Sequence, residues 1–260
     1  MEEEAALVLG LQQCKQDISA KMPRVVRYKL IEANAVPPAA PSKMVHFIRH
    51  GEGYHNVAQT EWRKQGKSAE PYDLEHDPDF KYLDPDLTEK GVEQAKSLQQ
   101  RTAEVKPELL VVSPMRRAIR TGLLAFESQV SGGSLKVLAQ ELLHETAGGH
   151  TCDKRLPRTD LASEFQQVDF SLIGEEDPLW SEVRETLPDL ATRAARFIEW
   201  VMARPEQHVA VATHSGFLRS LLVAVLDPEE DPLDPHFATG EMRSFVLTVA
   251  QVAGKRKKPD

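Results

Sequence analysis

The sequence predicts an α/β fold, arranged as a three-layer α/β/α sandwich around a mostly parallel central sheet. Short apolar runs typical of buried strands alternate with segments of helical periodicity, and these runs include MVHFI, LLVV, LKVLA and HVAVAT. Strands that alternate with helices form a sheet that helices cover on both faces. Three of these strands end in clusters of polar residues, and ligands bind beyond the carboxyl ends of the strands in such sheets.

The chain divides into three parts. Residues 1–42 form an N-terminal extension, with a helix from Glu2 to about Lys21, a short extended piece and a proline-rich connector at 35–42. We expect this extension to pack on the main body rather than to form an independent domain. Residues 43–253 form the main domain, and residues 254–260 form a basic tail that we expect to be disordered.

The elements of the main domain follow from apolar runs and from the residues that start and stop helices. Thr88 is the expected N-cap of the helix after the first loop, and Pro188 is expected to bend or break a long helix. In chain order we expect the strand MVHFI, a loop-rich stretch from about Gln59 to Asp86, a helix from Leu87 to about Val105, the strand LLVV, the helix MRRAIRTGLLAFES, the strand LKVLA, an irregular stretch toward Asp177, a helix from about Pro178 to Ala203, the strand HVAVAT, the helix SGFLRSLLVAVL and the last strand MRSFVLTVA.

The overall charge and the cysteine count exclude several classes of function. A net charge of −8 at pH 7 argues against generic binding to nucleic acid or to membrane surfaces, so a local cationic pocket must attract any anion. Cys14 and Cys152 form no disulfide framework and fit a reducing compartment. No apolar run approaches the roughly 18 residues of a membrane span, so we expect a soluble protein of the cytoplasm. The terminal KRKK also matches a nuclear address, and the oligomeric state stays open.

The residues at the strand ends suit the binding and transfer of a phosphoryl group. One strand ends in Arg49-His50, another is followed by Arg116 and Arg117, and a third ends in His214. Arginine guanidinium groups match phosphate oxygens bidentately, and a neutral imidazole can attack phosphorus without a base to deprotonate it. The departing alkoxide needs a proton, so we expect a carboxylic acid nearby.

Four ordered motifs carry a resemblance to a known family. These motifs are similar to the signatures of the histidine phosphatase superfamily, which is phosphoglycerate mutase-like. They are the run RHGE with a following asparagine, the segment DLTEKGVEQA, the element SPMRRAIRT and the motif THSGFLR. They span roughly residues 43–250. The spellings GEGYHN and ETAGGHTCDKR resemble the plant and fungal phosphatase-like branch most. The resemblance implies the fold of that superfamily and a phosphoryl-transfer activity.

The resemblance also implies roles for individual residues. His50 would be the nucleophile that accepts the phosphoryl group, and His214 would be a second, charged histidine that binds phosphate. Arg49 and Asn56 would contact the phosphoryl group, and Arg117 would be the second phosphate clamp. The same comparison makes Glu145 the proton donor, although the nearby Glu141 stays open as a rival.

Substrate contacts beyond the phosphoryl group are less constrained by the motifs. His55 lies beside the signature and either contacts substrate or packs. A basic trio behind the proposed acid, made of Lys154, Arg155 and Arg158, either holds a second anionic group of the substrate or forms a solvated face. The sequence does not reveal which phosphorylated small molecule is the substrate.

The sequence predicts no metal and no other cofactor. His144, His150, Cys152 and Asp153 lie close together in the sequence, but their spacing matches no common zinc pattern. We therefore expect a metal-independent phosphatase that acts through a phosphohistidine intermediate. A cofactor-dependent phosphoglycerate mutase and an inactive member that binds phosphorylated ligands remain the alternatives. The lack of a match to the substrate-binding region of glycolytic mutases favours the hydrolase.

Overall fold

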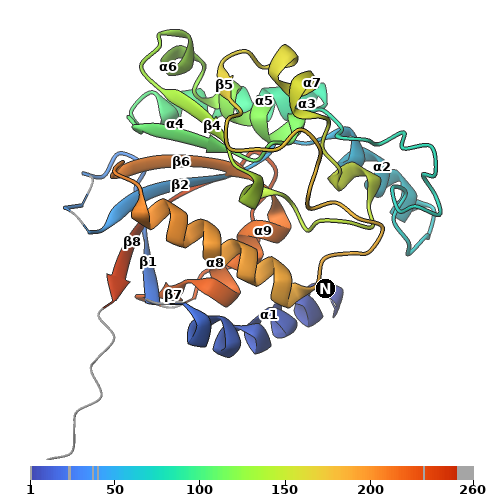
Figure 1. Cartoon of the computed structure of the whole chain (residues 1–260), viewed down its shortest axis with the longest axis horizontal. Coiled ribbons are helices and arrows are strands. Elements are labelled where there is room, and N and C mark those ends of the chain that lie inside the picture. The colour runs from blue at the N-terminus through green and yellow to red at the C-terminus, as the bar shows by residue number, and fades with distance from the viewer. Residues whose placement is uncertain (1, 23–24, 37, 40, 231, 251–260) are drawn as a thin grey trace, which may run out of the picture.

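The computed structural model describes residues 2–22, 25–36, 38–39, 41–230 and 232–250. The basic tail predicted at 254–260 lies outside these residues. One eight-stranded sheet runs through the described chain, with helices on both of its faces (Figure 1). The strands are β1 (Val25–Ile31), β2 (Lys43–Arg49), β3 (Leu109–Val112), β4 (Lys136–Ala139), β5 (Val168–Asp169), β6 (His208–Thr213), β7 (Asp227–Pro228) and β8 (Met242–Ala250).

The sheet is mostly parallel, as the sequence predicts. Its strand order is β5-β4-β3-β6-β2-β8-β1-β7, and β8 is the strand that runs antiparallel to both of its neighbours. The α-helices are α1 (Glu2–Lys21), α2 (Tyr54–Lys64), α3 (Glu89–Ser97), α4 (Gln99–Thr102), α5 (Arg116–Ala125), α6 (Glu127–Ser131), α7 (Arg158–Glu164), α8 (Leu187–Ala203) and α9 (Ser215–Ser220), with the shorter turns η1 (Glu141–Leu143), η2 (Thr151–Asp153) and η3 (Leu221–Val225).

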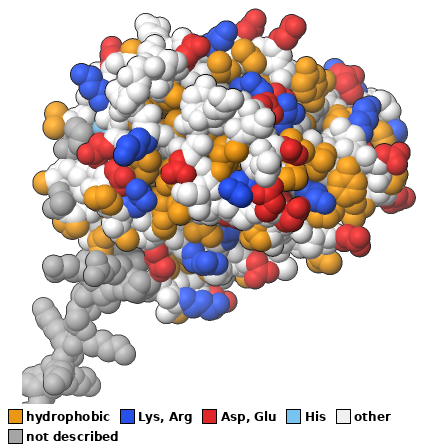
Figure 2. All heavy atoms as spheres, turned by 45° about the horizontal axis from the view of Figure 1, so that its top comes forward, with side chains coloured by type: hydrophobic (Ala, Val, Ile, Leu, Met, Phe, Trp, Pro, Cys, Tyr) orange, Lys and Arg blue, Asp and Glu red, His pale blue; other side chains and the backbone are white. Residues whose placement is uncertain are grey.

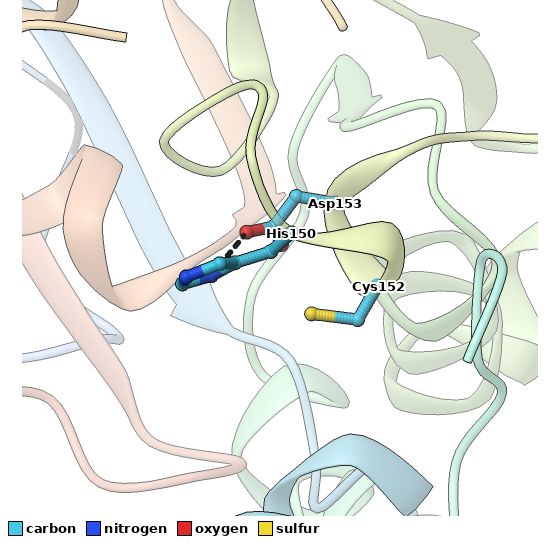
Figure 3. Close-up of side chains that lie close together, drawn as sticks. All are labelled: His150, Cys152 and Asp153. Atoms are coloured by element: carbon cyan, nitrogen blue, oxygen red, sulfur yellow. Dashed lines mark ion pairs between the residues drawn. The ribbon is translucent and has the colours of Figure 1, made fainter. Parts of the chain in front are cut away.

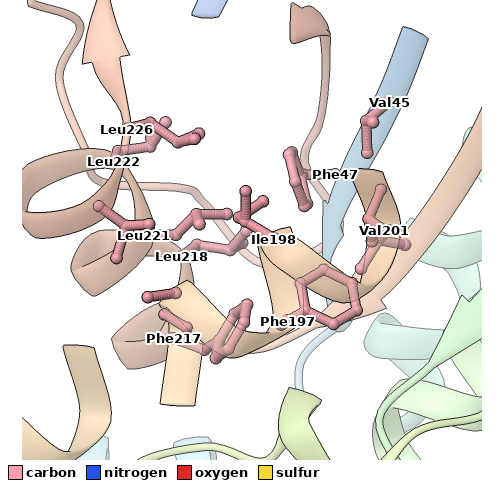
Figure 4. Close-up of a cluster of buried hydrophobic side chains, with 14 of the residues drawn as sticks. Val45, Phe47, Phe197, Ile198, Val201, Phe217, Leu218, Leu221, Leu222 and Leu226 are labelled. Carbon is pink, nitrogen blue, oxygen red and sulfur yellow. The ribbon is translucent and has the colours of Figure 1, made fainter. Parts of the chain in front are cut away.

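Two hydrophobic cores lie on the two faces of the sheet. Along β2, Val45 and Phe47 point to the first core, whereas Ile48 points to the second, because successive side chains of a strand alternate between faces. The first core is closed by α1, α8, α9 and η3, and Figure 4 shows residues from the last three of these elements. The second core is closed by α5 and α7, together with Leu98 between α3 and α4. The apolar run of β2 is therefore explained by burial on both faces.

The N-terminal segment is built into this body. β1 pairs antiparallel with β8 and parallel with β7, and α1 buries Leu11, Cys14 and Ile18 in the first core. Both cysteines of the chain are buried free thiols. None of the described helices combines the length and the apolar character that a bilayer span requires.

Several helices differ from the sequence prediction, and the helix expected to run to about Val105 is divided into α3 and α4. α2 occupies 54–64, where a loop was expected from residue 59, and it ends just before Gly66, whose φ of +74° is favourable for glycine. α7 lies inside the stretch predicted to be irregular. α8 begins at Leu187 rather than near residue 178, because Thr186 is its N-cap and Pro188 occupies its first turn, where a missing N–H costs nothing.

The loop after β2 is held against the start of α3 by an unusually close backbone contact. A Cβ on Gly51 would lie 2.4 Å from the carbonyl oxygen of Gly91, and a Cβ on Gly91 would lie 2.1 Å from that of Glu52. Thr88 is the N-cap of α3, as predicted, and its hydroxyl accepts the N–H of Gly91. These contacts fix the direction in which the chain leaves β2.

Candidate active site

A cavity of about 490 Å³ lies at the carboxyl ends of the central strands. His50 follows β2 and donates its backbone N–H to Thr213 at the end of β6, while Ser113 after β3 donates its N–H to Ala212. The strand ends predicted to converge are therefore neighbours. The cavity is lined by Leu7, Arg49, His50, His55, Asn56, Gln59, Arg63, Glu70, Tyr72, Glu145, Thr146, His150, Cys152, Asp153, Arg184, Ser215, Gly216, Arg219 and His236.

His50 is oriented by its own loop. Its Nδ1 donates to the carbonyl oxygen of Gly51 at 2.7 Å, so Nε2 carries the free lone pair. Burial, and secondarily the charge of Arg117, lowers the pKa of His50 well below its usual value, so the ring is neutral in the protein alone. A neutral, fixed imidazole at the cavity wall is suited to nucleophilic attack.

His214 lies beside His50, with ring centroids 5.1 Å apart. Its Nε2 pairs with the hydroxyl of Ser113 at 2.8 Å, and its buried Nδ1 has no hydrogen-bond partner. Burial, and secondarily Arg117, lowers the pKa of His214 well below its usual value. The ring of His214 is therefore neutral in the protein alone, whereas the predicted positive charge concerns the phosphate-bound state. Ser113, which the sequence did not assign, sets the orientation of the ring.

Arg49, Asn56 and His55 line the cavity around His50. Arg49 donates through Nη1 to the carbonyl oxygen of Phe237 at 2.6 Å, while its buried Nε has no hydrogen-bond partner. The side-chain oxygen of Asn56 accepts the N–H of Gly53 at 2.9 Å, which leaves its amide NH₂ group to contact an anion. The ring of His55 lies 5.5 Å from that of His50.

Arg117 is fully buried behind the cavity rather than in its wall. It donates to the carbonyl oxygen of Cys152 at 2.8 Å and to the carboxylate of Asp153 at 3.0 Å, and its Nε has no partner. The predicted phosphate clamp thus has two of its donors committed to the protein.

Glu145, the predicted proton donor, lines the cavity. Its carboxylate accepts the N–H groups of Gly216 and Phe217 at the start of α9, both at 3.2 Å, and also its neighbour's N–H at 3.0 Å. A Cβ at position 216 would lie 2.3 Å from Oε1 of Glu145, so a larger residue there would displace this carboxylate. Glu141 does not line the cavity and pairs with Arg155 at 2.9 Å. The geometry favours Glu145 over its rival as the candidate proton donor.

The basic trio predicted to bind substrate lies elsewhere. Arg155 is 2% exposed and donates to Glu141 and to four backbone carbonyl groups, so its guanidinium has a structural role. Arg158 pairs with the exposed Glu175, and the Nζ atom of Lys154 lies 4.6 Å from the ring centroid of Trp180. None of the three lines the cavity, so the structure corrects this prediction.

Three other arginines line the cavity in place of the predicted basic trio. Arg63 lies on the same face of α2 as Asn56, seven residues on, and pairs with Glu70 at 3.1 Å. Arg184 precedes α8 and pairs with Asp153 at 2.7 Å, and Arg219 comes from α9. A predicted helix over 54–64 would have indicated Arg63, and the motif THSGFLR contains Arg219. Nothing in the sequence indicates Arg184.

The distribution of charged side chains differs between the cavity and the outer surface. On the face drawn in Figure 2, lysine and arginine side chains are interspersed with aspartate and glutamate. Because the net charge is −8, attraction of an anion must come from the local group of arginines rather than from the overall field.

Among the described residues, both groups of side chains that could hold a metal ion include a carboxylate that already pairs with arginine. His150, Cys152 and Asp153 lie within 4.8 Å of one another (Figure 3). However, Asp153 is already paired with two arginines, Arg117 and Arg184. The second group, Glu141, His144 and Asp177, includes a carboxylate already paired with Arg155.

Fold and site together define an α/β protein with a histidine- and arginine-rich anion pocket at the strand ends. A family profile matches residues 45–248, and the chain belongs to the histidine phosphatase superfamily (branch 1). A phosphoglycerate mutase-like protein of Arabidopsis thaliana is 34% identical over 244 residues, which cover 81% of this chain and 86% of that protein. A probable phosphatase of Schizosaccharomyces pombe is 30% identical over 198 residues, which cover 74% and 82%.

Solved structures share the fold at lower identity. The ecdysone phosphate phosphatase of Bombyx mori, solved with tungstate, superposes with a TM-score of 0.54 at 15% identity, over 84% of this chain and 98% of that one. A putative alpha-ribazole-5'-P phosphatase of Escherichia coli gives a TM-score of 0.50 at 20% identity, over 78% and 89%. At these identities the likeness shows the fold alone.

Proposed function

We propose that the protein is a metal-independent phosphatase that hydrolyses a phosphomonoester through a phosphohistidine at His50. The orientation of His50 carries the proposal, since Nδ1 is fixed by Gly51 and Nε2 is left with its lone pair at the cavity. Nε2 attacks phosphorus, the bond from phosphorus to the ester oxygen breaks, and Glu145 protonates the departing oxygen. Water then attacks the phosphohistidine while Glu145 takes up its proton, which releases phosphate.

Charge stabilisation comes from groups that the fold has already placed. Arg49 and the amide of Asn56 contact the phosphoryl oxygens, and the buried charge of Arg117 lies behind the histidines. The transition state distributes negative charge over three equatorial oxygens, which fixed cations stabilise without reorganisation. A bound dianion would also favour the protonated form of His214.

The three Arabidopsis thaliana relatives named phosphoglycerate mutase-like support a second candidate, a mutase that returns the phosphoryl group to its substrate. Such an enzyme would form the same phosphohistidine but would transfer it to an alcohol rather than to water. Dependence of the activity on a 2,3-bisphosphoglycerate primer would identify it.

The decisive experiment is rapid-quench trapping of the intermediate. The full-length protein is mixed with a ³²P-labelled phosphomonoester in EDTA and stopped within milliseconds. Acid-labile, base-stable label on His50 together with released phosphate is expected. His50→Ala should carry no label, whereas His76→Ala, which changes an exposed histidine outside the cavity, should label like wild type.

Each outcome separates the candidates. Loss of label and turnover in EDTA, restored by a divalent metal, would overturn metal independence. Label without released phosphate, discharged by added phosphoglycerate, would favour the mutase. The absence of both label and turnover across a panel of phosphomonoesters would leave an inactive ligand-binding protein.

A further inference from the structure

The N-terminal helix reaches the cavity, although it lies outside the segment that matches the family. Leu7 of α1 is one of the residues that line the same cavity as His50 and Glu145. The family match begins only at residue 45, so this wall comes from a part of the chain that the common domain does not include.

Leu7 extends an apolar stripe beyond the core. Leu11, Cys14 and Ile18 are at most 9% exposed and pack in the first core, and Leu7 precedes Leu11 by one helical turn on the same face. Leu7 is half-buried, because it packs partly against this core and partly faces the cavity. Among the described residues that line the cavity, it is the one aliphatic side chain.

The position of α1 relative to the cavity is fixed by close packing. Figure 1 shows the N-terminal end of α1 beside the start of α8. A Cβ on Gly10 would lie 2.7 Å from Cδ1 of Leu187, three residues after the cavity residue Arg184. Farther along the helix, Lys15 pairs with Asp227 at 2.6 Å. Leu7 is thus held in place rather than carried on a loose terminus.

The cavity is large enough to hold more of a substrate than its phosphoryl group. Pockets for small organic ligands measure about 300–1,000 Å³, and the value here of about 490 Å³ leaves room for a leaving group beyond the phosphoryl group. We propose that Leu7 is a specificity-determining residue that contacts a hydrocarbon portion of this leaving group. This inference rests on the proposed phosphatase function, and it assigns the substrate to phosphomonoesters with a partly apolar leaving group.

The test uses binding rather than turnover, with a series of non-hydrolysable alkylphosphonates. Methyl-, butyl- and octylphosphonate are titrated calorimetrically into the full-length protein, so that the dianion stays constant while the hydrocarbon lengthens. Wild type should bind a longer phosphonate more tightly. Leu7→Ala should reduce this gain by about five-fold and leave the dissociation constant of methylphosphonate unchanged.

Two further variants make the result specific. Leu9→Ala changes a leucine of the same helix that is 56% exposed and does not line the cavity, so it should keep the full gain. Leu7→Met, which conserves volume, should also keep most of it. A purely structural role of Leu7 would weaken methylphosphonate binding as well.

The outcomes distinguish failure of this inference from failure of the proposed function. Methylphosphonate binding without any gain for longer chains, or an equal gain in Leu7→Ala, would overturn the role of Leu7 and leave the phosphatase proposal standing. If wild type binds no phosphonate at all and hydrolyses no phosphomonoester, both proposals fail.

Discussion

Two pairs of histidines lie on or directly after the neighbouring strands β2 and β6, and they differ in what their ring nitrogens contact. His46, in the middle of β2, pairs through Nδ1 with Ser244 at 2.7 Å and through Nε2 with Nε2 of His208 at 2.5 Å. His50, at the end of the strand, has one nitrogen fixed by Gly51 and the other at the cavity. A histidine with both ring nitrogens paired and one with a ring nitrogen open to the cavity are therefore only four positions apart.

The direction of the pKa shift does not distinguish His46 from His50 and His214, because burial lowers the pKa of all three. Burial lowers the pKa of His46 to about 3, and burial also lowers the pKa of His50 and of His214 well below the usual value. A lowered histidine pKa is thus no mark of function in this protein. The informative difference is a ring nitrogen that the protein leaves unpaired beside a cavity, as also occurs for His55.

His50→Asn and His46→Asn should differ more strongly in kcat than any other pair of variants. His50→Asn should lower kcat by at least about 10⁴-fold, because it removes the nucleophile, and should change the free energy of unfolding little. His46→Asn should leave kcat within about two-fold but lower the free energy of unfolding by about 1–3 kcal/mol, because buried hydrogen bonds are lost. Steady-state kinetics and urea unfolding measure the two quantities. Equal losses of activity in both variants would remove the distinction.

The acid should show a similar contrast between Glu145 and Glu141. Glu145→Gln should lower kcat by about 10²–10⁴-fold for alkyl phosphates and much less for p-nitrophenyl phosphate, whose leaving group needs little protonation. Glu141→Gln should retain kcat and lower stability, since it weakens the pair with the buried Arg155. A larger loss of kcat in Glu141→Gln than in Glu145→Gln would reverse the assignment.

The free energy of unfolding should decrease in mild acid, and the buried pair of His46 and His208 should account for part of this decrease. The pKa of His46 is about 3 in the folded protein and about 6.5 in the unfolded chain, so the unfolded state binds one more proton between these values. The free energy of unfolding therefore decreases as pH falls below about 6.5, by about 1.4 kcal/mol per pH unit for this group. Urea unfolding at pH 7, 6 and 5 should show a shallower decline for His46→Gln than for wild type. Parallel declines would exclude His46 as a source.

Much of the site could be predicted because its motifs lie directly after strands. His50 and His214 each follow a short apolar run, and the parallel sheet brings the ends of such runs together without further information. The core helix α3 was predictable from its N-cap Thr88 for the same local reason. Local patterns sufficed wherever one secondary-structure element determined the position of a residue.

The outer cavity could not be predicted because it is assembled from segments that are distant in sequence. Arg184 reaches the cavity from a loop and is oriented by Asp153, and Leu7 reaches it from the N-terminal helix. The trio at 154–158 is nearer in sequence to Glu145 than Arg184 is, yet Arg155 turns into the protein to satisfy backbone carbonyl groups. Tertiary packing, rather than proximity along the chain, decides which cations face the substrate.

A comparison of Arg184→Gln with Arg158→Gln tests which arginine contacts the substrate, and the difference should be smaller than in the variants above. Arg184 lines the cavity, so its loss should raise KM about five-fold for phosphomonoesters that carry a second anionic group, with kcat nearly unchanged. Arg158 is an exposed arginine paired with Glu175 outside the cavity, so its replacement should leave KM unchanged. A rise of KM in Arg158→Gln but not in Arg184→Gln would restore the sequence-based assignment. Equal values in both would mean that the substrate makes no ionic contact with Arg184, and Arg63 and Arg219 would then be the arginines of the cavity left to test.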